Sequence, residues 1–347
     1  MPLPTRALRL ALTGLALATA LPACAQMPAS PGGDALVLQA HEASRLRDKP
    51  ALAALRAQAL REDHPLASWV DYWEIGARLS EAKQEDLEAF YARWPGSYVE
   101  DRLRNDWLLE LGKRRDWANV KRDYPRFRMD DDREVRCYAL LARHLDGENV
   151  RQAAIAAWLD QRDKDDGCQL LAHTLQGAGR LPEADAWLKI RLSAEAGRHR
   201  AARAAAGVLG ESIERQVADL LDSPTRYLAR RASPKPGAPA EMALIAILRI
   251  AVNDPEVAAT QLQSWGRRLP PELAAWAWAG TARRAGMDHL PQAAEYYERA
   301  WQTLPKGHDA SAWPMDTLAW AVRAALRSPL PAERRWALVQ RAIDAMP

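Results

Sequence analysis

The sequence predicts an all-α protein built from stacked helical hairpins. Ala, Leu, Arg, Glu and Trp dominate its 347 residues, whereas only 18 glycines and two phenylalanines occur. Most of these abundant side chains lose little rotamer freedom in a helix. Apolar residues also recur with helical spacing along most of the chain, and no stretch has the pattern of a β-strand. Because the chain is longer than a typical single core, we expect domains or stacked repeats.

The first clear apolar stripes predict three helices in the N-terminal third. They cover residues 66–77, 87–94 and 99–111, and residues 94–97 interrupt the pattern with a Trp-Pro-Gly-Ser turn. Gly112 follows the third stripe, and glycine is common where a helix ends. The order is therefore helix, short turn, helix.

The same alternation continues in the middle of the chain. Apolar stripes at residues 135–145, 150–159 and 170–175 predict three more helices. Gly147 separates the first two, and glycines at 177–179 follow the last. These segments are expected to form helical hairpins in series.

Three Leu-Pro pairs predict further helix starts. Pro182, Pro291 and Pro331 each precede a helical pattern, where the missing proline N–H costs no hydrogen bond. The pairs are 109 and 40 residues apart, so no strict repeat period is kept. The Pro-rich segment 233–239 is the one clear non-helical loop, and we expect a hinge near residues 232–240.

Stacking follows from the hairpin pattern, because one hairpin cannot bury its apolar face alone. Neighbouring hairpins are therefore expected to form a curved superhelix, an α-solenoid of the tetratricopeptide kind. We therefore expect three parts in the chain: a signal peptide at residues 1–25, a flexible start and first helix at 26–64, and a superhelical domain at 65–347.

The N-terminus has the features of a secretory signal peptide. Arg6 and Arg9 precede an apolar run, and small residues follow it. Cleavage before Gln26 is one interpretation. The alternative treats residues 21–24 as a lipobox, with lipidation of Cys24 and anchoring to the outer membrane. Either route exports the chain to the periplasm, and no later segment is long and apolar enough to cross a bilayer.

Two cysteines remain if Cys24 leaves with the signal peptide. Cys137 and Cys168 would then be an even pair in an oxidising compartment, which favours a disulfide. Two separately buried thiols are the alternative, and a metal pair is disfavoured because no Cys or His partner lies at ligand spacing.

Charge argues against a nucleic-acid partner. The formal net charge is +3, and basic and acidic residues are mixed throughout, so no basic stripe could follow a phosphate backbone. The acidic run at residues 130–132 lacks the alternating ligands and turn glycine of a calcium loop, so we interpret it as a helix start. We expect no metal and no cofactor.

The fourteen tryptophans are mostly expected to pack inside the hairpins. Six of them fall on apolar helical stripes, where filling an interface is their expected role: Trp69, Trp73, Trp107, Trp158, Trp276 and Trp301. Trp265 and Trp313 lie near predicted helix ends, and they are the candidates for exposed rings that stack on sugars.

No motif with a catalytic mechanism is present. The sequence lacks a phosphate-binding glycine loop, a zinc-binding His-Glu-x-x-His helix and a Gly-x-Ser-x-Gly elbow. Its histidines are scattered, with no two at the spacing that places them on one helix face. We therefore predict no catalytic residue in this chain.

The order of several segments resembles the N-terminal region of soluble lytic murein transglycosylases. These segments are residues 69–75, 90–97 and 111–117 with Tyr124-Pro125 after them, and the likeness extends from about residue 65 to the chain end. It implies a U-shaped superhelix with Cys137 and Cys168 disulfide-bonded between successive helices.

The resemblance also implies a function in peptidoglycan. In that family a lysozyme-like C-terminal domain uses a Glu-Ser acid/base to cleave murein strands to 1,6-anhydromuropeptides. The dipeptide Glu211-Ser212 lacks the segments that follow the family's Glu-Ser pair, so we interpret Glu211 as a helix-start carboxylate. The sequence ends at Pro347, before such a domain could begin, so the chain alone is expected to be inactive.

Two functions from different classes follow. The first is a noncatalytic scaffold that associates with peptidoglycan and works with a missing or separate C-terminal catalytic domain. The second is an independent tetratricopeptide-like module that holds a periplasmic protein on its concave face. A self-sufficient enzyme is disfavoured, since no cluster of titratable residues supports one.

Overall fold

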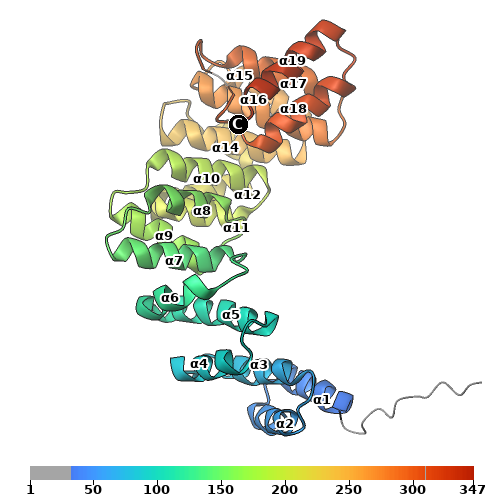
Figure 1. The fold of residues 1–347 in the computed structure, drawn as a ribbon. Helices are drawn as coiled ribbons and strands as arrows, with labels where there is room; N and C mark the ends of the chain where they lie inside the picture. The colour runs from blue at the N-terminus through green and yellow to red at the C-terminus, as the bar shows by residue number, and fades with distance from the viewer. Residues whose placement is uncertain (1–32, 309) are drawn as a thin grey trace, which may run out of the picture. The chain divides into compact units, whose positions relative to one another are not determined.

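The protein is all-α, as predicted. The structure, a computed structural model, describes residues 33–308 and 310–347, and these form nineteen α-helices and one short 3-10 helix (Figure 1). No β-strand occurs in these two ranges. Among the residues described, no helix combines the length and apolar character needed to cross a bilayer.

The chain divides into two compact units, Met1–Glu81 and Ala82–Pro347. The described part of the first unit contains three helices: α1 (Gly33–Leu46), α2 (Lys49–Arg61) and α3 (Ala67–Ala77). All three helices pack against one another around buried Leu36, Leu52 and Val70. The predicted start of the superhelical domain at residue 65 therefore falls inside this unit, and two helices precede it.

The second unit holds the remaining helices. In chain order they are α4 (Gln84–Arg93), α5 (Tyr98–Arg114), α6 (Trp117–Asp123), η1 (Tyr124–Arg126), α7 (Arg133–Leu145), α8 (Arg151–Asp160), α9 (Asp166–Gly177), α10 (Glu183–Glu195), α11 (His199–Val208), α12 (Glu211–Asp222), α13 (Pro224–Arg230), α14 (Ala238–Asn253), α15 (Pro255–Trp265), α16 (Pro271–Met287), α17 (Ala293–Thr303), α18 (Met315–Arg327) and α19 (Ala332–Asp344). Most consecutive helices of this unit contact each other, and α9 contacts α11. Further contacts join helices that are not consecutive, namely α7 with α9, α10 with α14, α14 with α16, and α16 with α18.

Local chemistry sets most of the helix ends. Gly147 and Gly179 have φ of 87° and 64°, so the predicted turns use the left-handed backbone that glycine adopts without strain. Pro182 and Pro331 are the N-cap residues of α10 and α19, and Pro291 lies just before the N-cap of α17. The three predicted Leu-Pro helix starts are confirmed.

Gly112 does not end its helix, so that prediction is wrong. Helix α5 continues to Arg114, and Arg115 closes it with φ of 59°. Gly112 instead lies under the ring of Tyr138 from α7, where a Cβ would be only 2.3 Å from the Tyr138 Cδ2 atom. The glycine therefore allows two helices to approach closely.

Helix α14 is the most deeply buried element of the second unit. Eleven of its 16 residues are buried, including every position from Ala240 to Leu248. The helix contacts α10, α12, α13, α15 and α16. Its one buried carboxylate, Glu241, accepts two hydrogen bonds from Arg191 of α10 at 2.9 and 2.7 Å.

The Pro-rich segment leads from α13 into α14. Helices on both sides of it contribute to one hydrophobic core through Tyr227, Leu228 and Ala240. The two compact units meet elsewhere in the sequence, at residues 81 and 82. The hinge near residues 232–240 stays a prediction.

Candidate functional site

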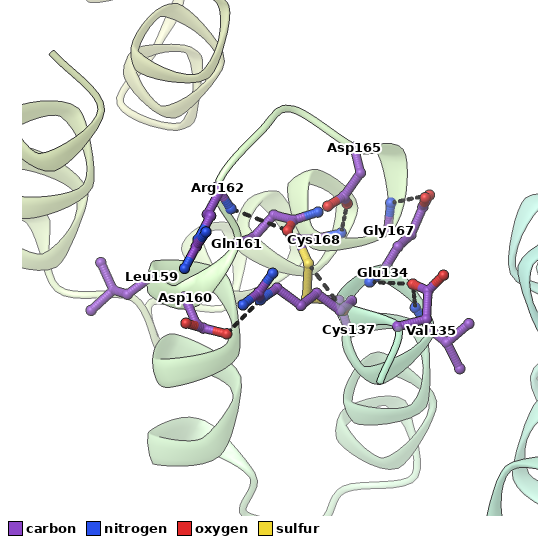
Figure 2. The surroundings of a disulfide bond; sticks show 12 residues. Glu134, Val135, Cys137, Leu159, Asp160, Gln161, Arg162, Asp165, Gly167 and Cys168 are labelled. Carbon is purple, nitrogen blue, oxygen red and sulfur yellow. Dashed lines mark hydrogen bonds and ion pairs between the residues drawn. A yellow bond between two sulfur atoms is a disulfide. The ribbon is translucent and has the colours of Figure 1, made fainter. Parts of the chain in front are cut away.

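The predicted disulfide is present between α7 and α9. Cys137 and Cys168 are both buried, with Cα atoms 4.9 Å apart, and the bond joins residues separated by 31 positions (Figure 2). Glu134 accepts a hydrogen bond from the Gly167 amide at 3.1 Å beside it. A Cβ at Gly167 would lie 2.8 Å from the Glu134 Cγ atom, so this contact also requires glycine.

A half-buried acid and a buried amine lie next to the disulfide. Asp165 caps α9 by accepting a hydrogen bond from the Cys168 amide at 2.6 Å, and its Oδ2 atom has no partner within the described chain (Figure 2). Lys189 of α10 donates to the backbone oxygens of Leu159 and Gln161. Burial raises the pKa of Asp165 to about 6 and lowers that of Lys189 to about 8.

A cationic hollow opens beside this pair, where the 161–165 loop meets the turn between α10 and α11. Its volume is about 500 Å³. The residues that line this cationic hollow are Asp163, Lys164, Gly197, Arg198, His199, Arg200 and Ala201. Gly197 has a φ of 69°, and this left-handed backbone conformation turns the chain after α10. Arg198 to Arg200 follow this turn, at the start of α11.

The charge of this hollow is positive at neutral pH. Lys164, Arg198 and Arg200 make no ion pair with any described residue, and Asp163 is the only lining acid. Burial, helped by the Arg249 guanidinium, lowers the pKa of His199, so its ring is neutral there. The amino end of α11 faces this region and adds partial positive charge. The hollow suits carboxylate ligands.

A second, smaller cavity lies at the carboxyl end of α10. It has a volume of about 180 Å³, and α10, α14 and α16 line it. Glu195 is its buried acid, and the Glu195 Oε1 atom accepts a hydrogen bond from Trp276 Nε1 at 2.5 Å. Burial raises the pKa of Glu195, while Arg283 and the Trp276 hydrogen bond oppose that rise.

Glu211-Ser212 lies at the start of α12. The Glu211 side chain is 81% exposed at the start of α12 and lies 3.7 Å from Arg215. The interpretation of Glu211 as a helix-start carboxylate is confirmed. Within residues 33–308 and 310–347, no group of three His, Cys, Asp or Glu side chains is placed to hold a metal ion.

The acidic run at 130–132 also has structural contacts. Asp132 caps α7 by accepting hydrogen bonds from the Glu134 and Val135 amides, and Asp130 accepts one from the Tyr124 hydroxyl at 2.8 Å. Its predicted role as a helix start is confirmed.

Trp265 and Trp313 are buried, so the expectation of exposed stacking rings is wrong for both. Each is only 5% exposed. The Arg268 guanidinium covers the Trp265 ring at 4.3 Å, and the Trp313 ring packs against Trp301 with centroids 5.0 Å apart. A ring near a helix end stays buried when the following turn folds back toward the helix. The turn after Trp265 does so, because the Leu269 amide donates a hydrogen bond to the Trp265 carbonyl oxygen.

Sequence reasoning missed the exposed tryptophan. Trp336 on α19 is 65% exposed, and Ile343, one heptad later, is 51% exposed. The signal was available, because Leu338, Val339 and Ala342 form the buried stripe of this helix and Trp336 lies off it. Cys24 and the signal peptide lie outside the described residues, so their processing stays a prediction.

Comparison with known proteins gives structural matches only. No family model matches the chain, and no curated protein matches its sequence. The 70-kDa soluble lytic transglycosylase from Escherichia coli matches with a TM-score of 0.52 and 19% identity, over 90% of this chain and 49% of that one. A 70-kDa soluble lytic transglycosylase in complex with bulgecin A matches with a TM-score of 0.52 and 18% identity, over 91% of this chain and 50% of that one.

A third solved structure gives the same result. The lytic transglycosylase Slt from Pseudomonas aeruginosa, an inactive mutant, matches with a TM-score of 0.52 and 21% identity, over 88% of this chain and 55% of that one. The chain spans about half the length of the structures it matches. It therefore has the helical fold that these soluble lytic transglycosylases contain, as the resemblance in sequence order predicts.

Proposed function

We propose that this chain is a noncatalytic, periplasmic scaffold that binds peptidoglycan and works with a separate murein-cleaving domain. The observation that carries the proposal is the fold shared with lytic transglycosylases over about 90% of this chain. The Glu-Ser pair of this chain is an exposed helix start, which supports the noncatalytic part of the proposal.

The cationic hollow is the surface we assign to murein contact. Peptide stems of murein carry carboxylates, and Arg198 and Arg200 have no competing acid partner in the described chain. Charge-assisted hydrogen bonds from guanidinium to carboxylate are among the stronger polar contacts available at a surface. Binding through these groups should weaken as salt concentration rises.

Cosedimentation with purified sacculi tests this function. We expect the chain to sediment with murein and to release no anhydromuropeptides. The double variant Arg198→Gln, Arg200→Gln should reduce the bound fraction severalfold at low salt. Arg267→Gln with Arg341→Gln is the matched control, because it removes the same charge from exposed positions on other elements. Failure of the wild-type chain to sediment would contradict murein binding, and release of anhydromuropeptides would contradict the noncatalytic role.

A protein-interaction module is the second candidate. Trp336, Ile343 and Leu326 are exposed apolar side chains on the last two helices, and exposed aromatic residues are enriched at protein interfaces. Affinity capture from a periplasmic extract distinguishes the two. A stoichiometric protein partner lost on Trp336→Ser would favour this candidate, whereas retention on murein alone would favour the scaffold.

A further inference from the structure

The hairpin formed by α18 and α19 exposes a group of large apolar side chains. The two helices pack against each other across the turn at residues 328–331. Met315, Leu326, Trp336 and Ile343 of this hairpin are between 48% and 65% exposed. Single exposed apolar residues are ordinary on a protein surface, whereas a contiguous group of them marks an interaction site. The position of these four side chains on the hairpin therefore decides what they can do.

The exposed residues of α18 have the spacing of a helix-packing stripe. Met315, Ala319, Val322 and Leu326 follow one another at intervals of four, three and four residues. Because an α-helix turns by roughly 100° per residue, this spacing places them in one narrow stripe. A separate stripe around Ala321 is buried inside the protein. Helix α18 thus has two apolar sides, of which one packs in the core.

The exposed stripe of α18 faces away from the neighbouring helix α16. Trp320 and Ala324 face α16, because they lie 3.4 and 3.8 Å from where a Cβ at Gly286 would be. Met315 and Leu326 lie roughly 150° around the helix from these two residues. The stripe is therefore on the outer side of α18.

Helix α19 repeats this arrangement. Arg334 donates a hydrogen bond to Glu298 of α17 at 2.8 Å, so this side of α19 faces the core. Trp336 and Ile343, seven residues apart, lie roughly 170° around the helix from Arg334. The exposed residues of both helices are therefore on the outer side of one hairpin. We call them the outer seam: Met315, Ala319, Val322, Leu326, Trp336 and Ile343.

The two edges of the outer seam carry opposite charges. Arg323 and Arg327 border it on α18, and Glu333 and Asp344 border it on α19. Arg327 and Glu333 are both exposed, and neither forms an ion pair with a described residue. The Arg327 Nη1 atom contacts the Nδ1 atom of His289 at 3.0 Å. The seam is thus apolar along its centre, basic along one edge and acidic along the other.

A surface of this kind is complementary to a second copy of itself. A two-fold axis parallel to the helices sets α18 of one copy on α19 of the other, so each basic edge meets an acidic edge. Arg327 then meets Glu333 of the second copy, because both residues lie beside the turn of the hairpin. Asp316 is an acid on the basic edge, but Arg283 of its own chain already binds it at 2.6 Å. An axis across the helices would instead set each edge against its own charge.

A lipid surface is the other occupant that an exposed face with a tryptophan can suit. The acidic edge argues against it, since the anionic lipids of a membrane would repel Glu333 and Asp344. A second copy of the chain satisfies both edges and covers the apolar centre.

We propose that the outer seam is a self-association surface through which two copies of this chain form a two-fold dimer. The inference names the partner for the second candidate function, the protein-interaction module, and does not depend on murein binding. Each helix has 13 residues and is roughly 20 Å long, so the hairpin would bury roughly 400 Å² per copy, about half of a standard interface. The dimer is therefore weak and reversible, with a Kd in the micromolar range.

Sedimentation velocity of the whole chain over a range of micromolar concentrations tests the proposal. The wild type should shift from monomer to dimer as the concentration rises. Trp336→Glu should remain monomeric throughout, because it places a charge in the apolar centre of the seam. Its melting temperature should stay that of a wild-type monomer, since the Trp336 side chain is 65% exposed. Val257→Glu, at an exposed position of α15, is the matched control and should dimerise as the wild type does.

Charge reversal tests the two-fold arrangement itself. Arg327→Glu and Glu333→Arg should each weaken the dimer severalfold at low salt, because like charges then meet across the axis. The double variant with both reversals should regain the wild-type Kd, because every pair is again opposite in charge. Such rescue requires both residues to lie in one interface, so binding to a lipid surface or to an unrelated protein cannot produce it.

Three results would overturn the inference. They are a wild-type chain that stays monomeric at every concentration, a Trp336→Glu variant that dimerises as the wild type does, and single reversals that the double variant does not rescue. A monomeric chain that floats with anionic vesicles through Trp336 would assign the seam to a membrane instead.

These outcomes are separable from the proposed function. A monomeric wild type that sediments with sacculi would leave the murein scaffold intact and remove the dimer. A dimer that does not sediment would do the reverse. A monomer that captures a different protein through Trp336 would keep the interaction module and remove only the second copy as its partner.

Discussion

At the scale of single residues, Gly112 shows how little space separates neighbouring helices of the second unit. The ring of Tyr138 lies where a Cβ at position 112 would be, with three ring carbons at 2.3 to 2.5 Å from it. The aromatic ring is itself buried, so it has no free space into which to move. The glycine therefore sets the distance between α5 and α7.

We expect Gly112→Ala to destabilise the protein by about 1–3 kcal/mol, as overpacking in a close-packed core does. Gly76→Ala is the matched control, because Gly76 lies in α3 with nothing within 4 Å of its added Cβ. That change should stabilise by about 0.5–1 kcal/mol through helix propensity. Urea unfolding of each variant measures both effects, and equal midpoints for the two alanine variants would contradict the close contact.

Asp165 gives a pH-dependent prediction. Burial raises its pKa from 3.8 to about 6, so the folded state binds a proton more tightly than the unfolded state between these values. The stability linked to that proton is fully present below pH 3.8 and is lost as the pH rises through about 6. Asp165→Asn keeps an oxygen that can cap α9 but carries no charge.

The melting temperature of Asp165→Asn relative to wild type should therefore increase between about pH 4 and pH 7. Asp254→Asn is the control, since Asp254 caps α15 at an exposed position. A difference that is the same at both pH values, or one that Asp254→Asn reproduces, would show that burial of Asp165 is not its cause.

Residue-level prediction from sequence succeeded where neighbours in the chain decide the outcome. The role of Glu211 as a helix-start carboxylate depends on local sequence, and the structure agrees. Glu195 could not be identified in this way, because its partner Trp276 is 81 residues away and its own helix has no distinguishing motif. Trp265 and Trp313 failed for the same reason, since rings from other helices or turns cover them.

At the scale of elements, the disulfide connects two helices that already pack together. Helices α7 and α9 contact each other, and α8 lies between them in sequence. In the chain-entropy account, closing a loop of 31 residues restricts the unfolded chain and stabilises the fold by about 3.5 kcal/mol. The stabilisation belongs to the whole α7–α9 segment rather than to one contact.

We expect a reductant to lower the melting temperature of the wild-type chain by about 5 °C or more. The double variant Cys137→Ser, Cys168→Ser should melt near the reduced wild type and should not respond to reductant. Differential scanning calorimetry with and without reductant measures both. Identical melting of oxidised and reduced wild type would show that the bond does not stabilise the fold.

Helices and their turns were the elements best predicted from sequence. Apolar periodicity and glycine or proline punctuation are local signals, and they placed α7, α8 and α9 within a few residues. The end of α5 was missed because a glycine required for packing looks the same in sequence as a glycine required for a turn. Only the identity of the facing residue, Tyr138, separates the two cases.

At the scale of the whole molecule, the division into units could not be read from composition. The segment around residues 81–82 contains no Pro-rich or Gly-rich linker, whereas the conspicuous loop at 233–239 lies within the second unit. Unit boundaries depend on which helices contact each other, and those contacts are set by side chains distant in sequence. The fold class was predictable for the opposite reason, since it needs only local periodicity.

The burial of residues 240–248 of α14 has a consequence for the chain before it folds. Residues 242–248 form an uninterrupted apolar run, Met-Ala-Leu-Ile-Ala-Ile-Leu, and such windows promote aggregation whenever they are exposed. Glu241 and Arg249 flank the run directly and act as gatekeepers that discourage self-association in a newly made chain. Glu241 thus has two roles at different times, because after folding the same carboxylate binds Arg191 across the packed helices.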